Sequence, residues 1–271
     1  MTPLLSVLLL GFFLGMRHAT DVDHVIAVTT IVSRQRSVRA AAWTGVLWGL
    51  GHTLTILAVG GAIVLFGLVI PPRVGLGMEF SVAIMLILLG ILTLTGVARR
   101  IHEAREGTSH AGGHEDCHAH PHVHGDYVHS HVHGHAPGAH GHLDEATPQA
   151  RLDRALGRFG AYRMLRPLVV GLVHGLAGSA AAALLVLAAI RDPWWAIGYL
   201  LVFGVGTIAG MMLVTAAVAL PFAVTASRFA WLNRHLATAS GVLSLAFGLW
   251  MAYQIGVVDG LFSANPRWSP E

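Results

Sequence analysis

The sequence Gly15-Met-Arg-His-Ala-Thr-Asp-Val-Asp-His24 places an arginine, two histidines and two aspartates inside an apolar run. Apolar residues lie on both sides of it, over 4–14 and 25–28. Each ionisable group near a bilayer centre costs roughly 2.5–3.5 kcal/mol on insertion scales, so such groups usually have a function. Imidazole and carboxylate together are also ligands of divalent transition metals. The stretch therefore predicts a metal site inside a membrane-embedded segment.

The composition is that of an integral membrane protein. Only 11% of the 271 residues are charged, 54% are hydrophobic, and the mean hydropathy is +0.63, whereas a soluble domain has about 25% charged residues. The pI near 9.6 does not indicate a nucleic-acid partner, because the basic residues are all arginine and cluster between the apolar segments. The single cysteine, Cys117, excludes an intramolecular disulfide. The N-terminal run has no basic region before it and no small-residue cleavage site, so it predicts a retained helix and not a signal peptide.

Six segments approach the length of about 20 apolar residues that spans a bilayer. Proline cannot continue a helix, so Pro71-Pro72 is expected to end the second segment and Pro221 the fifth. The prediction is an all-α polytopic membrane protein with six transmembrane helices. The segments are about Pro3 to Val32 with its polar interruption, Ala40–Ile70, Met78–Ala98, Pro167–Ile190, Trp194–Leu220 and about Leu236–Val258.

The arginines divide unevenly between the two sides of these segments. One side has only Arg73, Arg191 and Arg267. The positive-inside rule therefore predicts a cell (inner) membrane protein with both termini outside and the long third-to-fourth loop in the cytoplasm. The loops on the arginine-rich side contain Arg34, Arg36, Arg39, Arg99, Arg100, Arg105, Arg151, Arg154, Arg158, Arg163, Arg166, Arg228 and Arg234.

Two matches indicate an internal repeat. Gly15–Ala19 resembles Gly171–Gly175, and Trp48–Thr53 resembles Phe203–Thr207, both about 156 residues apart. With three spans in each unit, the copies would lie in opposite membrane orientations, as in many transporters; chance similarity of glycine-rich helices is the alternative. The predicted units are a first three-helix repeat (1–98), a His-rich cytoplasmic loop (99–166), a second three-helix repeat (167–260) and a short tail (261–271).

The long loop has a different composition from the rest of the chain. Twelve histidines lie between His110 and His142, many of them alternating with other residues, and apolar residues are too few for a core. We therefore expect disorder there. A His-rich tract is typical of metal capture or buffering, and a solvated tract without a function is the alternative.

Helix geometry separates the polar residues of the opening stretch. At 100° per residue, His18, Asp21 and His24 share one broad face with Arg17 beside them, whereas Asp23 points away. Either Asp23 contacts another helix, or the helix is unwound here and the side chains converge. An Arg17–Asp21 ion pair is one structural interpretation. For the whole stretch, a buried hydrogen-bond network between helices is the alternative to a metal site.

Two further histidines lie in apolar segments. His52 follows Gly49 and Gly51, which permit close helix approach, and it is interpreted as a metal ligand or pathway residue given the cluster in the first span. His174 is interpreted in the same way because it corresponds to His18 in the repeat. For both residues the alternative is a hydrogen-bonded core histidine.

The residue types in and around the apolar segments narrow the choice of metal. Thr53 and Thr55 are expected to satisfy backbone groups. Imidazole with carboxylate suits nickel, cobalt or zinc, and the absence of cysteines from the apolar segments argues against copper(I). The predicted metal residues are His18, Asp21, Asp23, His24, His52 and His174.

The stretch Arg17–His24 resembles the His-x4-Asp-His signature of the nickel/cobalt transporter family, and Leu50–Thr53 resembles that family's second histidine motif. This resemblance implies that His18, Asp23, His24 and His52 handle the metal. The chain differs from the eight-span members in having six predicted spans and His174-Gly-Leu-Ala-Gly-Ser179 in the fourth. In this respect it is similar to the small urease-accessory-type nickel permeases of the same superfamily.

The resemblance implies a permease for Ni(II), and in second place Co(II), with the metal as transported ion and no prosthetic group. It also implies cytoplasmic partners, either a metallochaperone or urease or hydrogenase maturation proteins. The first-span motif favours uptake, while the His-rich loop is similar to that of the nickel/cobalt efflux branch, so efflux is the alternative. A membrane-embedded metalloenzyme is a weaker alternative, because the sequence has no HExxH pair.

Overall fold

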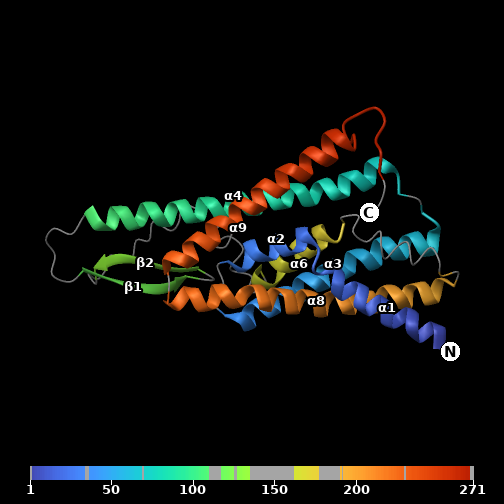
Figure 1. The fold of residues 1–271 in the computed structure, drawn as a ribbon, viewed down its shortest axis with the longest axis horizontal. Helices are drawn as coiled ribbons and strands as arrows, with labels where there is room; N and C mark the ends of the chain where they lie inside the picture. Colours follow the sequence, from blue (N-terminus) through green and yellow to red (C-terminus); the bar gives the residue numbers. More distant parts are fainter. Residues whose placement is uncertain are drawn as a thin grey trace.

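A computed structural model describes residues 2–33, 37–68, 70–109, 117–124, 127–134, 162–176, 190, 192–228 and 230–268. Helices dominate this part of the chain, and many of them run along the long axis of the molecule (Figure 1). The elements are α1 (Thr2–His18), α2 (Val22–Val32), α3 (Val38–Phe66), α4 (Pro72–Ser109), β1 (Cys117–His124), β2 (Tyr127–Gly134), α6 (Tyr162–His174), α8 (Pro193–Arg228), α9 (Ala230–Tyr253) and the π-helix η3 (Gln254–Val258).

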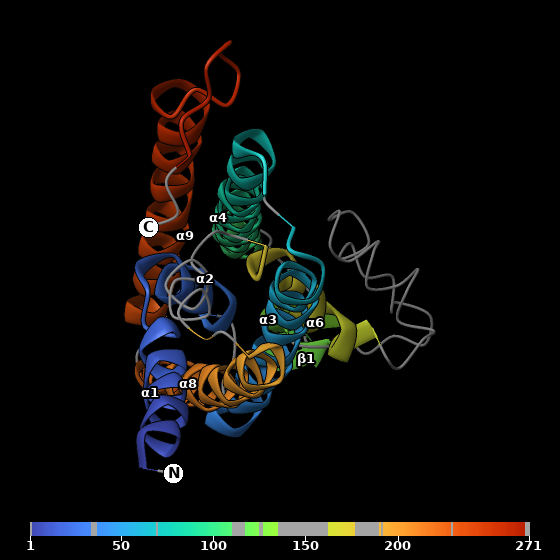
Figure 2. The same cartoon turned by 90° about the vertical axis from the view of Figure 1, so that its right-hand side faces the viewer.

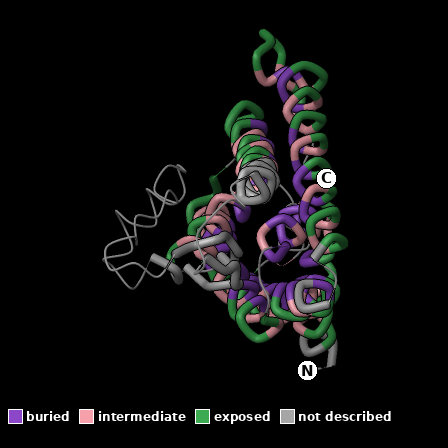
Figure 3. The backbone as a smooth tube through the Cα atoms, turned by 90° about the vertical axis from the view of Figure 1, so that its left-hand side faces the viewer, coloured by how far each residue is buried: buried purple, intermediate pink, exposed green. Residues whose placement is uncertain are grey.

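Four of these helices are long and apolar enough to cross a membrane, over Val38–Phe66, Pro72–Gly96, Pro193–Thr225 and Trp231–Val258. Large apolar side chains such as Leu88, Leu201 and Trp250 lie exposed along them, and Figure 3 shows exposed positions on the outer sides of the helices. Exposed apolar surface on this scale is unfavourable in water but matches lipid. The chain is therefore a membrane protein.

The helices form two groups. Seen along the molecule, α4 and α9 pack together on one side, α1, α3, α6 and α8 form the other side, and α2 lies between the groups (Figure 2). The hydroxyl of Ser244 in α9 donates to the carbonyl of Leu86 in α4 at 2.8 Å. One apolar core joins α2 to both groups through Ile26, Val28, Leu86 and Met211.

The first apolar segment is not one helix. Helix α1 ends at His18, Ala19 to Asp21 form a turn, and α2 begins at Val22. Asp21 has extended backbone angles (φ −60°, ψ 148°), which change the direction of the chain. Helix α6 likewise ends at a histidine, His174. The remainder of the predicted fourth span, 177–189, lies outside the described residues.

Glycines bring pairs of helices into backbone contact. In α1, a Cβ on Gly15 would overlap the carbonyl oxygen of Phe203 in α8, and one on Gly206 would overlap that of Phe12. In the α3–α6 pair, a Cβ on Gly51 would overlap the carbonyl oxygen of Leu168, and one on Gly171 that of Trp48. Only glycine permits such close approach, so these positions set the helix spacing around the centre of the molecule.

Several predicted boundaries are wrong. Pro221 lies inside α8 and does not end it; proline removes one backbone hydrogen bond from a helix, and helices in membranes tolerate this loss when neighbouring groups satisfy the freed carbonyl. Helix α3 ends at Phe66, before Pro71, with Gly67 in the left-handed conformation (φ 61°). Helix α4 itself continues to Ser109, but the part apolar enough to cross a membrane ends at Gly96, close to the predicted end of the third span at Ala98.

The His-rich loop also differs from its predicted disorder at one place. Strands β1 and β2 form an antiparallel two-stranded hairpin in which His118, His120 and His122 are the Cα partners of His133, His131 and His129. Alternation of residue types with a period of two is compatible with extended strands. The rest of the loop from 110 to 161 lies outside the described residues.

Candidate metal centre

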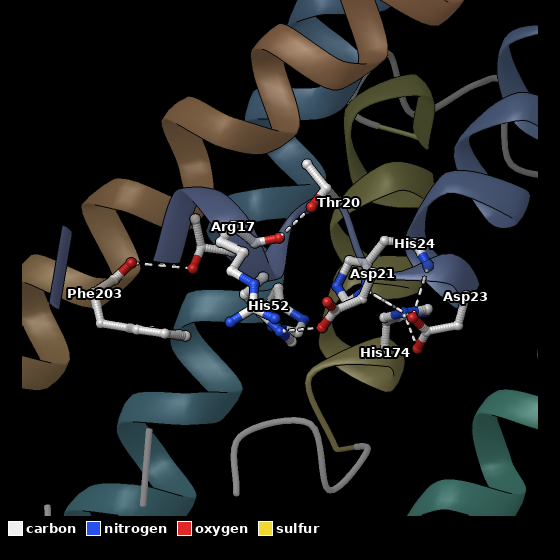
Figure 4. A network of polar contacts seen from close by, with 10 residues as sticks. Arg17, Thr20, Asp21, Asp23, His24, His52, His174 and Phe203 are labelled. Carbon is white, nitrogen blue, oxygen red and sulfur yellow. Dashed lines mark hydrogen bonds and ion pairs between the residues drawn. The ribbon is translucent and has the colours of Figure 1, made fainter. Parts of the chain in front are cut away.

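The centre lies where the ends of α1 and α6 and the start of α2 meet the continuous helix α3. His18 is the last residue of α1, Asp23 and His24 are in the first turn of α2, His52 lies within α3, and His174 is the last residue of α6. These side chains converge on one region (Figure 4). The four histidines are buried, with exposed fractions of 6% for His18, 1% for His52 and 0% for His24 and His174.

Three histidines form the first group of ligand atoms. The Nε2 atoms of His18 and His52 are 2.9 Å apart. The ring of His24 lies 4.7 Å from that of His18 and 5.1 Å from that of His52, between centroids. One nitrogen from each ring lies within 4.8 Å of the others, a spacing that can hold a metal ion.

A second group combines a carboxylate with two imidazoles. His24 Nδ1 lies 3.1 Å from Asp23 Oδ1 and 3.2 Å from His174 Nε2, and His174 Nε2 lies 3.1 Å from Asp23 Oδ2. Ligands bound about 2.0–2.1 Å from a metal lie roughly 2.8–3.4 Å from one another in octahedral or tetrahedral geometry. The two nitrogens have that spacing, and each lies beside a different oxygen of the Asp23 carboxylate; one ligand atom from each residue lies within 4.8 Å of the others. His24 belongs to both groups.

The break between α1 and α2 gives the two aspartates different surroundings. Asp21 accepts a hydrogen bond from His18 Nδ1 at 2.7 Å, and its side chain is 43% exposed. Asp23 is 15% exposed and faces His24 and His174. A carboxylate on the far nitrogen of a histidine fixes the tautomer of a metal-ligating ring. Asp21 therefore has the position of an orienting group, and Asp23 that of a direct ligand.

Several buried polar atoms of the centre lack protein partners within the described residues. His24 Nε2, His52 Nδ1 and His174 Nδ1 have no hydrogen-bond partner there. A buried polar atom without a partner costs about 1–3 kcal/mol, so clusters of them usually have a functional reason. Nitrogen and carboxylate donors of this kind fit a divalent nickel, cobalt or zinc ion.

Two neighbouring predictions have different outcomes. The predicted Arg17–Asp21 ion pair is wrong: within the described part of the chain, Asp21 pairs with His18, while Arg17 lies exposed. The predicted roles of the threonines are confirmed. The Thr53 hydroxyl donates to the Gly204 carbonyl at 3.2 Å, and the Thr55 hydroxyl donates to that of Leu172 at 2.9 Å.

Sequence reasoning missed the aromatic walls of the centre. The Trp48 ring is fully buried, stacks near His24 (6.3 Å, 15°) and meets the His174 ring edge-on at 5.4 Å. Phe203 lies 5.7 Å from the His18 ring. A signal for Trp48 was available, because it precedes His52 by four residues and therefore lies on the same helix face.

Fold and site together define an integral membrane protein with a buried imidazole–carboxylate centre suited to a transition-metal ion. The chain is 32% identical over 259 residues to the urease accessory protein UreH of Bacillus sp. (strain TB-90), covering 96% of each chain. It therefore belongs to the UreH family of urease accessory proteins, which is related to the nickel/cobalt transporter superfamily. No family model matches the chain, and no solved structure matches it.

Proposed function

We propose that this protein is a permease that carries Ni(II), and in second place Co(II), across the cytoplasmic membrane into the cell. The observation that carries the proposal is a buried cluster where α1 and α6 end, made of His18, Asp23, His24, His52 and His174. The relative's name connects it to urease, and the resemblance of the Arg17–His24 stretch to nickel transporters connects the cluster to nickel.

The chemistry of the cluster suits transport better than permanent binding. Each group supplies three protein ligands, which leaves room for retained water on an ion that prefers more ligands. Conduction requires sites that bind well enough to admit the ion and weakly enough to release it. The Asp23 carboxylate lies among the histidines with its side chain only 15% exposed, and a negative charge that is largely buried favours a cation beside it.

The proposed architecture has six spans arranged as two inverted three-helix units. The glycine contacts support it, because they repeat with the same offset as the sequence matches. Gly15 against Phe203 corresponds to Gly171 against Trp48, and Gly206 against Phe12 corresponds to Gly51 against Leu168. In inverted-repeat transporters, interrupted helices from the two halves meet near the bilayer midplane and form the substrate site.

The proposed orientation places both termini outside and the His-rich loop in the cytoplasm, as the arginine distribution predicts. The ends of the described chain lie toward one end of the molecule and the β1–β2 hairpin toward the other (Figure 1). An incoming ion would exchange water for the histidines and Asp23, then leave toward the cytoplasm. There the loop histidines would hold it for a metallochaperone or urease maturation proteins. The sequence has no nucleotide-binding motif, so the membrane potential, an ion gradient or a partner would supply the energy.

The test is nickel uptake into proteoliposomes that contain a nickel-sensitive dye. Wild-type protein should transport Ni(II), whereas His18→Ala and His52→Ala should reduce the rate to near that of empty vesicles. His235→Ala is the matched control, because His235 is exposed on α9 and bonds only to the Trp231 carbonyl among described partners. Transport at the wild-type rate by both site variants would remove the site assignment.

The direction of nickel transport needs a separate measurement, because efflux would use the same ligands and the His-rich loop is similar to that of efflux proteins. Cells that express the protein should accumulate more nickel than cells with His52→Ala. Lower accumulation together with better survival in nickel would establish export instead.

A further inference from the structure

We propose that the centre holds the ion in two alternative positions that share His24, and that transport moves the ion from one to the other. The three-histidine position consists of His18, His24 and His52. The aspartate position consists of Asp23, His24 and His174. This inference rests on the proposed transport function and adds a second step and a role for His174, which lies in the other half of the chain.

Each position can hold an ion with little rearrangement. In the aspartate position, His24 Nδ1 and His174 Nε2 lie 3.2 Å apart, and each lies 3.1 Å from a different oxygen of the Asp23 carboxylate; ligands around one bound ion are roughly 2.8–3.4 Å apart. In the three-histidine position, the Nε2 atoms of His18 and His52 lie 2.9 Å apart. The His24 ring lies between the rings of His18 and His174, with centroid distances of 4.7 and 4.1 Å.

His24 would serve the two positions through different nitrogens. Its Nδ1 contacts Asp23 and His174, while its Nε2 is buried and has no hydrogen-bond partner within the described residues. A neutral imidazole has one nitrogen with a free lone pair, and the other carries hydrogen. The neutral ring can therefore ligate at one position at a time. With the ion in the three-histidine position, Nδ1–H is able to donate to Asp23.

The two positions are related by the proposed repeat. His18 and His174 are each the last residue of a helix, and each lies three residues after a glycine, Gly15 or Gly171, that contacts a neighbouring helix backbone. Each also packs against an aromatic ring at the corresponding place, Phe203 at 5.7 Å from His18 and Trp48 at 5.4 Å from His174. Inverted halves face opposite sides of a membrane, so transfer between these histidines moves the ion from one half to the other.

Exposure indicates the order of the steps. The three-histidine position is connected through His18 to Asp21, whose side chain is 43% exposed, whereas Asp23 in the aspartate position is 15% exposed. The ion would enter through the three-histidine position and pass to the aspartate position by exchanging His18 and His52 for Asp23 and His174. His24 is a ligand in both positions, but the exchange includes a change of tautomer: Nε2 releases the ion and takes up a proton, and Nδ1 loses its proton and binds the ion.

Binding to purified, detergent-solubilised protein separates the two positions without transport. Because the loop histidines are also proposed to bind nickel, the ions at the centre are counted as those lost in His24→Ala. Nickel titration should give one such ion per chain for wild type, and His52→Ala and His174→Ala should both retain it. X-ray absorption at the nickel edge should then find three imidazoles in His174→Ala, and two imidazoles with a carboxylate in His52→Ala. His24→Ala should weaken binding by at least about 100-fold, the upper range for loss of an outer-shell partner, and His235→Ala should behave as wild type. In proteoliposomes, His52→Ala and His174→Ala should both bind nickel and fail to transport it.

Three results would overturn the two-position arrangement: two ions bound at once at the centre in wild type, loss of binding at the centre in both His52→Ala and His174→Ala, or wild-type transport by His174→Ala. His174→Gln, which retains a donor toward Asp23, provides a second variant if the alanine protein is not monodisperse. Wild-type protein that shows both binding signatures but no nickel flux would instead remove the proposed function.

Discussion

The Nε2 atoms of His18 and His52 lie 2.9 Å apart in the protein interior. At this distance one ring donates its N–H and the other accepts. A divalent ion can replace that single hydrogen and take both nitrogens as ligands. The contact that satisfies these rings without metal therefore also keeps them in position for it, which limits the rearrangement needed on binding.

The two aspartates should respond differently to removal of charge. Asp21→Asn retains an acceptor for the His18 N–H but removes the carboxylate, so nickel affinity should fall by about 10- to 100-fold. Asp23→Asn changes a direct ligand and should lower the nickel affinity more than Asp21→Asn does. The measurement is nickel titration of purified protein. Asp192→Asn is the control, because Asp192 accepts from the Trp194 backbone N–H at 2.8 Å outside the centre. A larger loss for Asp21→Asn than for Asp23→Asn would identify Asp21 as the direct ligand.

Two glycine substitutions should have opposite effects on stability. A Cβ at Gly15 meets the Phe203 backbone, which cannot move aside, so Gly15→Ala should destabilise the protein by about 1–3 kcal/mol. A Cβ at Gly61 in α3 would meet no heavy atom of the described chain within 4 Å, so Gly61→Ala should be neutral or stabilising by up to about 1 kcal/mol. Thermal unfolding in detergent tests both. Equal behaviour of the two variants would contradict the close α1–α8 packing.

The sequence was sufficient to predict a polytopic helical membrane protein and the first half of the centre. Ionisable residues in an apolar run are costly, so His18, His24 and His52 were identifiable without a structure. Helix angles alone could not assign Asp21 and Asp23, because they assume a continuous helix. The break at Ala19 to Asp21 removes that assumption.

Contacts between residues far apart in the chain were harder to predict from the sequence. His174 contacts His24 across 150 residues of sequence; the repeat pointed to His174 as a metal residue, but local patterns do not fix such a contact. The end assigned at Pro221 failed for a related reason. The rule that proline ends helices is local, and the surroundings of α8 override it.

Trp48 should act on the centre through shape. Trp48→Ala removes a fully buried ring and should lower the free energy of unfolding by about 3–5 kcal/mol because of the cavity left behind. Nickel binding should also weaken, because the His24 and His174 rings lose the aromatic ring that packs against them. Trp48→Phe keeps an aromatic face and removes the indole N–H, which is buried without a partner among the described residues, so its stability should be closer to wild type. Thermal unfolding and nickel titration of both variants are the measurements. Equal losses in the two variants would mean that the indole nitrogen itself is required.

The His-rich loop should be separable from the membrane fold. Deleting residues 110–142 leaves α4 through Ser109 and α6 from Tyr162 in place, so thermal unfolding and helix content by circular dichroism should match the full chain. Replacing the same residues with a glycine–serine linker of equal length controls for the change in loop length. Loss of the folded protein in both forms would show that the loop is required for the membrane fold.

Nickel should stabilise the folded protein in proportion to its binding. A ligand that binds only the folded state at 100 times its Kd adds about 2.7 kcal/mol, so thermal unfolding should shift upward with added Ni(II). His24→Ala should abolish the shift, because His24 belongs to both ligand groups, whereas His235→Ala should retain it. Mg(II) should have no effect, since it prefers oxygen ligands in octahedral geometry. A full shift in His24→Ala would place the bound nickel elsewhere, and the His-rich loop deletion, measured in the same way, would show whether it lies there.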